Sequence, residues 1–206
     1  MPAEIRKIYT DHPQTRLIQH AVNVMKQGGL IVYPTDTIYG LGADLFNKDA
    51  MSKIFRIKKT SNHKLLSFIC PDLKEIATWA VVPDYAYKIM RRVTPGSYTF
   101  VLPATKKVPK TLLQKRKTVG IRIPDSIVSI ALTTELGRPI LSTSVPQGED
   151  GYYTDPEEIM DRFRNEIDLI LDAGVTFNKP STIVDFTSAE PQILREGSGS
   201  IEELYY

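Results

Sequence analysis

Short apolar runs that end at a proline or a glycine alternate along this chain with segments whose apolar residues follow helical spacing. LIVYP at residues 30–34 and TVGIRIP at residues 118–124 are too short to be buried helices, and a proline ends each of them as a strand. Apolar side chains in residues 17–25 recur at helical spacing, and a Gly-Gly pair follows at residues 28–29. This alternation restricts the chain to an α/β fold in which helices cover a mixed sheet.

The same criteria predict the remaining elements. Strands are expected at residues 30–34, 65–70, 98–104, 118–124, 139–144, 167–174, 181–186 and 192–197. Helices are expected at residues 11–28, 48–59, 72–80, 83–93, 126–137 and 155–163. Asp11, Asn47 and Asp155 are the expected N-caps of the first, second and last of these helices. A turn or short helix is expected at residues 108–114, and a mobile lid at the polar segment 144–156.

The length and composition of the chain fit one domain. Of its 206 residues, 42% are hydrophobic, which is enough to bury a core without disulfides or a structural metal. No repeat, low-complexity segment or linker-like stretch divides the sequence. We therefore predict a single α/β domain over residues 1–206, built on a twisted mixed sheet flanked by helices.

Several classes of protein are excluded by what the sequence lacks. Cys70 is the single cysteine, and His12, His20 and His63 have no metal-ligand spacing, so no disulfide framework and no zinc site are expected. No apolar run could span a bilayer and the first residues do not resemble a signal peptide, so we expect a cytoplasmic protein. The sequence has no phosphate-loop, dinucleotide-binding, zinc-protease or nucleophile-elbow motif.

The net charge of +2 conceals two blocks of opposite sign. Residues 86–124 hold ten basic side chains and no acidic one, whereas residues 145–206 hold fourteen acidic side chains against four basic ones. Blocks of this kind predict one basic and one acidic face. The alternative is that folding intermixes the two blocks, so that the surface averages out.

Hydroxyl groups gather where predicted strands begin or end, and two arginines lie inside predicted strands. These residues are Thr35, Thr37, Ser142, Thr143, Ser144, Ser181 and Thr182, with Arg122 and Arg195. Ligands of open α/β sheets bind beyond strand ends, where such hydroxyls and guanidinium groups would hold a phosphate or a carboxylate. The alternative is that the hydroxyls only cap turns.

Six segments, in this order, resemble the motifs of the YrdC-like, or threonylcarbamoyl-AMP synthase, family. They are PTDTIYGLG (34–42), TPGSYTFVL (94–102), VGIRIP (119–124), STS (142–144), PSTIVDF (180–186) and ILREG (193–197). The second resembles the family's T-P-G-P-x-T segment, with Ser97 in place of the second proline. The resemblance covers roughly residues 16–197.

The resemblance implies a deep, basic, concave cleft in the sheet and a nucleotidyltransferase reaction. Family members join L-threonine, bicarbonate and ATP into threonylcarbamoyl-AMP and pyrophosphate, which feeds a modification of tRNA. By the resemblance, Thr35 and Thr37 belong to the motif that holds threonine, Tyr39 walls its pocket, and Arg122 binds its carboxylate. Ser181 or Thr182 would close the amino-acid end.

The nucleotide and its phosphates would lie among the other motif residues. These are Thr118, Ser142, Ser144 and Arg195, and the residues expected to act in catalysis are Lys58, Arg122 and Ser144. Mg²⁺ would arrive with ATP, which agrees with a chain that has no metal-ligand cluster of its own. Catalysis would depend on positioning and on cationic clamps, because the reaction needs no protein nucleophile.

Two departures from the synthase pattern place the chain with the YciO branch of the family. Synthases have K-x-R where this chain has Lys58-Lys59-Thr60, and S-x-N where it has Ser144-Val145-Pro146. The loss of one charge-assisted contact in a transition state lowers a rate by about a hundredfold or more. The activity is therefore expected to be weak.

Two other functions remain open. The first is an RNA-binding paralogue that recognises tRNA or double-stranded RNA by shape and backbone, with the chemistry lost or changed. Its expected contacts are Lys106, Lys107, Lys110, Lys115, Arg116 and Lys117, for which the alternative is a solvated, lysine-rich loop. The second is a related transfer onto AMP from another amino acid. No membrane contact is expected, and the chain would be a monomer or a homodimer.

Overall fold

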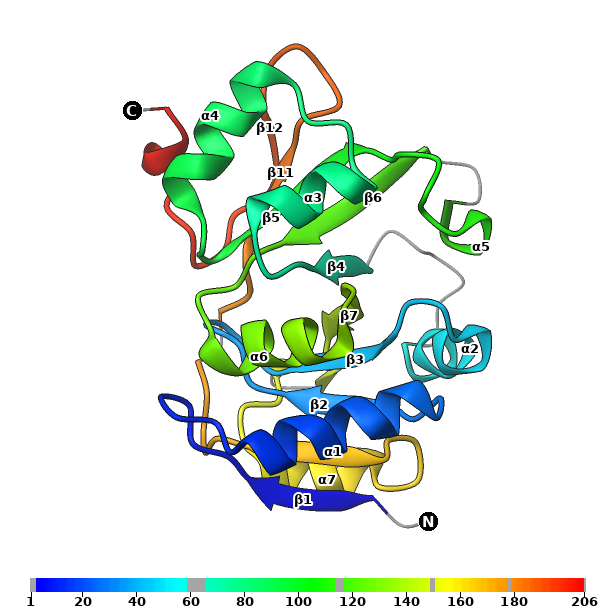
Figure 1. Cartoon of the computed structure of the whole chain (residues 1–206). Helices are drawn as coiled ribbons and strands as arrows, with labels where there is room; N and C mark the ends of the chain where they lie inside the picture. The colour runs from blue at the N-terminus through cyan, green and yellow to red at the C-terminus, as the bar shows by residue number, and fades with distance from the viewer. Residues whose placement is uncertain (1–2, 59–65, 114–116, 149–150, 178, 206) are drawn as a thin grey trace.

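The computed structural model describes residues 3–58, 66–113, 117–148, 151–177 and 179–205 (Figure 1). The strands are β1 (Glu4–Lys7), β2 (Ile31–Tyr33), β3 (Gly40–Asp44), β4 (Ser67–Ile69), β5 (Tyr98–Pro103), β6 (Thr118–Arg122), β7 (Ile140–Ser144), β8 (Gln147–Gly148), β9 (Gly151–Tyr152), β10 (Leu169–Asp172), β11 (Thr182–Asp185) and β12 (Gln192–Arg195). The helices are α1 (Thr15–Lys26), α2 (Lys48–Ile57), α3 (Leu73–Trp79), α4 (Asp84–Val93), α5 (Lys110–Leu113), α6 (Ile127–Leu136), α7 (Pro156–Phe163) and the 3₁₀ turn η2 (Glu202–Leu204).

One mixed sheet of ten strands organises the molecule. Its order is β1-β10-β2-β3-β7-β4-β6-β5-β11-β12, and β8 and β9 form a separate hairpin. Four pairs are parallel, namely β1 with β10, β10 with β2, β4 with β6, and β5 with β11, and the other neighbours are antiparallel. The predicted α/β architecture with a mixed sheet flanked by helices is therefore confirmed.

Two hydrophobic clusters cover the two faces of the lower half of the sheet. On β10, Leu169 and Leu171 pack with α1 and α6, whereas Ile170 packs with the cluster that contains Ile159 and Phe163 of α7. Side chains that alternate along a strand point to opposite faces of the sheet, so α1 and α6 cover one face and α7 the other. Figure 1 shows α1 and α6 side by side, with α7 behind the sheet.

Strand β5 shows how the upper half of the sheet keeps one face open. Tyr98, Phe100 and Leu102 are buried in the cluster that includes the apolar face of α4. The alternate residues Thr99 and Val101 are only half-buried and line a cavity on the opposite face. The face of β5 opposite α4 is therefore the side on which the candidate site lies.

Most predicted elements agree with the structure, and the first helix is corrected at its start. Asn47 and Asp155 cap α2 and α7 with their side chains as predicted, but Asp11 does not cap α1, which begins at Thr15 after Gln14. The Gln14 side chain instead accepts a hydrogen bond from the Tyr9 amide at 3.2 Å, which holds the preceding residues as a loop. The predicted lid at residues 144–156 contains the β8–β9 hairpin, and β1 and β3 were not predicted.

Two glycines of the PTDTIYGLG motif make room for a buried tyrosine ring. A Cβ atom at Gly40 would lie 2.9 Å from Cζ of Tyr33, and one at Gly42 would lie 2.8 Å from its Cε1. Tyr33 is fully buried, and its hydroxyl lies 2.7 Å from the Ser142 hydroxyl on β7. The motif's glycines therefore bring β2, β3 and β7 close together around one aromatic ring.

Gly197 offers a direct test of close backbone packing at the other end of the chain. A Cβ atom there would lie 2.2 Å from the carbonyl oxygen of Pro180, whereas one at Gly137 would meet nothing within 4 Å. We expect Gly197→Ala to lower the free energy of unfolding by about 3 kcal/mol, because the backbone must shift. Gly137→Ala should lower the free energy of unfolding by about 1 kcal/mol. The cost at this position comes from the left-handed φ of 71° and not from a steric clash. Chemical denaturation of the two variants checks the order, and an equal loss would contradict it.

Candidate functional site

A cavity of about 1010 Å³ opens on the uncovered face of the sheet. Its wall includes residues of β3, β4 and β7 on one side and of β5, β6, β11 and β12 on the other. All of the predicted catalytic, substrate-binding and nucleotide-binding residues line it except Thr37 and Thr182. Those that do are Thr35, Tyr39, Lys58, Thr118, Arg122, Ser142, Ser144, Ser181 and Arg195.

Thr37 and Thr182 are fully buried behind the cavity wall. The Thr37 hydroxyl accepts a hydrogen bond from Nη2 of Arg122 at 3.0 Å. The Thr182 hydroxyl donates to the carbonyl of Gly199 at 2.6 Å and accepts from the amide of Gly197 at 2.9 Å. Both side chains are therefore buried and bonded within the protein, and neither lines the cavity.

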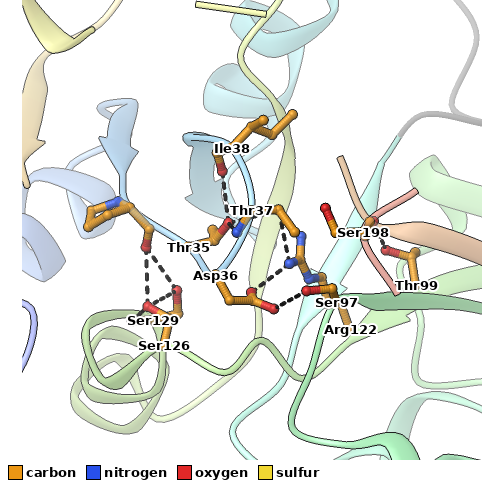
Figure 2. A network of polar contacts seen from close by, with 12 residues as sticks. Thr35, Asp36, Thr37, Ile38, Ser97, Thr99, Arg122, Ser126, Ser129 and Ser198 are labelled. Carbon is orange, nitrogen blue, oxygen red and sulfur yellow. Dashed lines mark hydrogen bonds and ion pairs between the residues drawn. The ribbon is translucent and has the colours of Figure 1, made fainter. Parts of the chain in front are cut away.

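Arg122, which lines the cavity, sits at the centre of a polar network (Figure 2). Its Nη2 donates to Oδ1 of Asp36 at 2.6 Å, and Oδ2 of Asp36 accepts from the Ser97 hydroxyl at 2.9 Å. Burial lowers the pKa of Arg122, and the charge of Asp36 opposes this shift. The Nε of Arg122 is buried and has no hydrogen-bond partner among the described residues.

Asp36 and Ser97 were not predicted as site residues. Each lies within a recognised motif, but an acid or a serine in a turn is usually assigned to the turn itself. A strand arginine needs a partner when it is buried. Arg122 in the strand at residues 118–124 was therefore the one signal in the sequence that an acid must lie nearby.

Lys58 and Arg195 supply positive charge that no ion pair with a described carboxylate offsets. The Lys58 ammonium donates to the Ser144 carbonyl at 3.3 Å, and Nη2 of Arg195 donates to the Ser181 carbonyl at 2.8 Å. Within the described ranges neither forms an ion pair. Burial lowers the pKa of Lys58, and the nearby charge of Arg195 lowers it further. Two half-buried cations without counterions form a site for an anion.

Several hydroxyls of the site already have protein partners. The Thr35 hydroxyl donates to the Ile38 carbonyl at 2.8 Å, and the Tyr39 hydroxyl donates to the Gly174 carbonyl at 2.7 Å. The Thr99 and Ser181 hydroxyls lie 2.9 Å apart. Thr35 thus stabilises its own turn, as the alternative interpretation held, and also lines the cavity. Burial raises the pKa of Tyr39, so this side chain stays protonated.

Three further residues of the cavity wall come from the segment predicted as a lid and from α7. Tyr152, Tyr153 and Arg162 line the cavity, and Tyr153 packs edge-on against Phe163 with ring centroids 5.7 Å apart. Arg162 was not predicted because an arginine on an amphipathic helix usually lies on its solvated face. Pro146, which stands where synthases have asparagine, also lines the cavity.

Of the residues expected to contact RNA, Lys106, Lys107, Lys110 and Lys117 are exposed. They flank Val108 and α5, which contribute apolar side chains to the cavity wall. Lys115, Arg116 and Thr60 lie outside the described residues.

No group of three or more His, Cys, Asp or Glu that could hold a metal ion occurs in the described part of the chain. Among the described residues that line the cavity, Asp185 is the acidic one. Such a wall fits a Mg²⁺ ion held by phosphates and water better than an ion held in a protein cage. Over the same residues, no helix is long and apolar enough to cross a membrane.

The proximity of Lys58 to Arg195 can be tested by titration. Replacing Arg195 by Gln removes a positive charge, so the pKa of Lys58 should rise. An NMR titration followed at the lysine Cε signals measures this shift, with Lys58→Arg for assignment. Arg6→Gln, on the exposed strand β1, is the matched control and should leave the Lys58 signal unchanged. An unshifted pKa in R195Q would contradict the arrangement.

Comparison with known proteins agrees with this geometry. The protein named "Uncharacterized protein YciO" of Escherichia coli (strain K12) is 44% identical over 197 residues, which is 95% of this chain and 96% of that one. The crystal structure of E. coli YciO matches 98% of this chain and 99% of its own, with a TM-score of 0.93 and 42% identity. The threonylcarbamoyl-AMP synthase of Coxiella burnetii is 33% identical over 181 residues, 85% of this chain and 96% of the synthase.

A structure of Pyrococcus abyssi Sua5 complexed with L-threonine matches 98% of this chain with a TM-score of 0.90 and 28% identity, although this chain spans only 60% of Sua5. The family model Sua5/YciO/YrdC, described as "Telomere recombination", matches residues 23–197. The predicted resemblance is therefore confirmed: the chain belongs to the Sua5/YciO/YrdC family.

Proposed function

We propose that this chain is a threonylcarbamoyl-AMP synthase-like nucleotidyltransferase that uses L-threonine, bicarbonate and ATP. The observation that carries the proposal is the cavity itself, which has a paired arginine at one end and counterion-free cations beside it. An amino acid and a polyphosphate need these two different environments. The synthase from C. burnetii and the threonine-bound Sua5 support the same substrate class.

The proposed reaction has two steps. The threonine amine attacks the carbon of bicarbonate, water leaves, and a carbamate forms. A carbamate oxygen then attacks the α-phosphorus of ATP, and the bond from that phosphorus to pyrophosphate breaks. Arg122 would orient the threonine carboxylate, with Thr35 and Ser181 beside it. Lys58 and Arg195 would stabilise the charge that develops on the phosphoryl oxygens, and Ser142, Ser144 and Thr118 would bind the nucleotide.

Magnesium would bind to the ATP phosphates and shield their charge. The chain's own part is to exclude water and to fix the direction of attack. Pro146 offers no amide where synthases have asparagine, which removes one polar contact from the cavity wall. The reaction would be slow, because Lys58 and Arg195 would stabilise the transition state without a hydrogen bond from that amide.

The test is direct. The purified protein, incubated with ATP, Mg²⁺, L-threonine and bicarbonate, should release pyrophosphate and give a product with the mass of threonylcarbamoyl-AMP. Arg122→Ala should lower the rate by about a hundredfold or more, since a buried charge-assisted contact is lost. Arg164→Ala is the matched control, because Arg164 lies on the surface and pairs with Asp161.

Product from the wild-type and R164A proteins, but not from R122A, would support the synthase. Absence of product from a folded wild-type protein that still binds nucleotide would overturn it. Product with another amino acid in place of threonine would show the same chemistry on a different substrate.

A second function, RNA binding, is favoured by the exposed lysines at the cavity rim. Lys106, Lys107 and Lys110 are exposed, and no ion pair between described residues involves them. Lysines without acidic partners are available for phosphate contacts, which are sensitive to salt and indifferent to sequence.

The triple variant K106A/K107A/K110A should bind tRNA and an unrelated RNA duplex more weakly. If all three lysines contact phosphates, the slope of log K against log salt should fall by roughly 2. The control K26A/K48A/K74A removes the same charge from exposed positions on or beside other helices. Undetectable binding of the wild-type protein at moderate salt, or equal slopes for both variants, would rule out this function.

A further inference from the structure

The cations of the cavity fall into two kinds. Lys58 and Arg195 donate to neutral backbone oxygens, whereas Arg122 donates to the carboxylate of Asp36. Lys58 and Arg195 therefore bring positive charge to the cavity wall with no ion pair among the described residues, whereas Arg122 and Asp36 form a charge pair with no net charge. Arg195 lies close enough to Arg122 that its charge lowers the pKa of Arg122. Asp36 thus neutralises the charge of Arg122 and makes it different from the charges of Lys58 and Arg195.

Asp36 is held in place from two sides (Figure 2). One carboxylate oxygen accepts from Arg122 at 2.6 Å, and the other accepts from the Ser97 hydroxyl at 2.9 Å. The side chains of Arg122 and Asp36 are only 9% and 11% exposed, so solvent screens their interaction weakly. The Thr37 hydroxyl accepts a further hydrogen bond from the same nitrogen of Arg122. The guanidinium is therefore fixed before any ligand arrives.

One hydrogen-bond donor of Arg122 remains unused, which points to a ligand. Its Nε is buried without a partner in the described structure, although the residue lines the cavity. A buried, charged donor that lacks an acceptor is unfavourable, and a carboxylate would supply that acceptor.

We propose that Asp36, held by Ser97, is a positioning residue that makes the Arg122 end of the cavity select an amino-acid zwitterion over the same acid without its ammonium group. Asp36 does not line the cavity, so it acts through Arg122 and through its charge. The inference rests on the proposed function, in which this end of the cavity receives threonine.

The physical reason is the match between two dipoles. A zwitterion has one negative and one positive pole and no net charge, and so has the Arg122–Asp36 pair. Replacing Asp36 by Asn keeps the size of the side chain and one acceptor oxygen but leaves an unbalanced positive charge. That charge attracts a net anion more strongly than it attracts a neutral zwitterion.

The residue that holds Asp36, Ser97, departs from the motif of the family. It occupies the position at which the T-P-G-P-x-T motif has a proline, which has no hydroxyl to donate. The hydrogen bond from Ser97 holds Oδ2 of Asp36 and leaves Oδ1 facing Arg122.

The test compares L-threonine with 3-hydroxybutanoate, which is threonine without its α-amino group. Isothermal titration calorimetry measures both dissociation constants for the wild type, Asp36→Asn, Ser97→Ala and Ser97→Thr. The wild type should prefer threonine, and D36N should reduce that preference by about tenfold or more. S97A should lie between them, and S97T, which keeps the hydroxyl, should restore the wild-type preference. In turnover, D36N should raise the KM for threonine and leave the KM for ATP unchanged.

Asp161→Asn is the matched control, because Asp161 also pairs with an arginine but lies on the surface of α7. A preference that stays unchanged in D36N and in S97A, with wild-type nucleotide affinity and circular dichroism, would overturn the inference. A wild-type protein that binds neither compound would also overturn it. If the wild type shows the preference yet forms no threonylcarbamoyl-AMP, the proposed function fails and the inference is supported.

Discussion

Arg122 is a permanent charge inside a sheet, and much of the site is arranged around that fact. An arginine cannot escape burial by losing its proton, so the fold must supply partners for it. Asp36 and Thr37 come from the loop after β2, and Ser97, which holds Asp36, comes from the turn before β5. Three motifs that lie far apart in the sequence therefore meet at one guanidinium group. In the sheet, β6 lies next to β5 and is separated from β2 by β3, β7 and β4.

The sequence predicted the elements whose signals are local. Apolar periodicity and side-chain caps located α2 and α7, and short apolar runs located β2 and β6. Strand β3 has no such signal, because its glycines are selected by the ring of Tyr33 from a different strand. The edge strand β1 alternates weakly, and its pairing with β10 depends on residues more than 160 positions away. Long-range partners of this kind are not visible in a local pattern.

The same distinction separates the site residues that were predicted from those that were not. Hydroxyls and arginines at strand ends can be recognised as candidate ligand-binding groups from the residue type alone, and most of them line the cavity. Thr182 shares that identity but points into the protein, since it neighbours Ser181 and adjacent residues of a strand face opposite sides. Thr37 is buried in the loop after β2, where its hydroxyl accepts a hydrogen bond from Arg122. Asp36 and Arg162 were missed for the opposite reason. An acid in a turn and an arginine on a helix are common surface residues, and only the tertiary structure brings them to Arg122 and to the cavity.

The two ends of the cavity are held with different rigidity, and this follows from where their residues lie. Arg122 is fixed on a central strand by buried partners, which favours a preorganised site for a small, well-defined group. Lys58 follows the last turn of α2, and Arg195 ends the edge strand β12. Both are half-buried, and the described partners of their cationic groups are the Ser144 carbonyl and the carbonyl and hydroxyl of Ser181. Thr182 stabilises that edge through Gly197 and Gly199, but no strand lies beyond β12. The positive charge of Lys58 and Arg195 is therefore less enclosed by protein than that of Arg122.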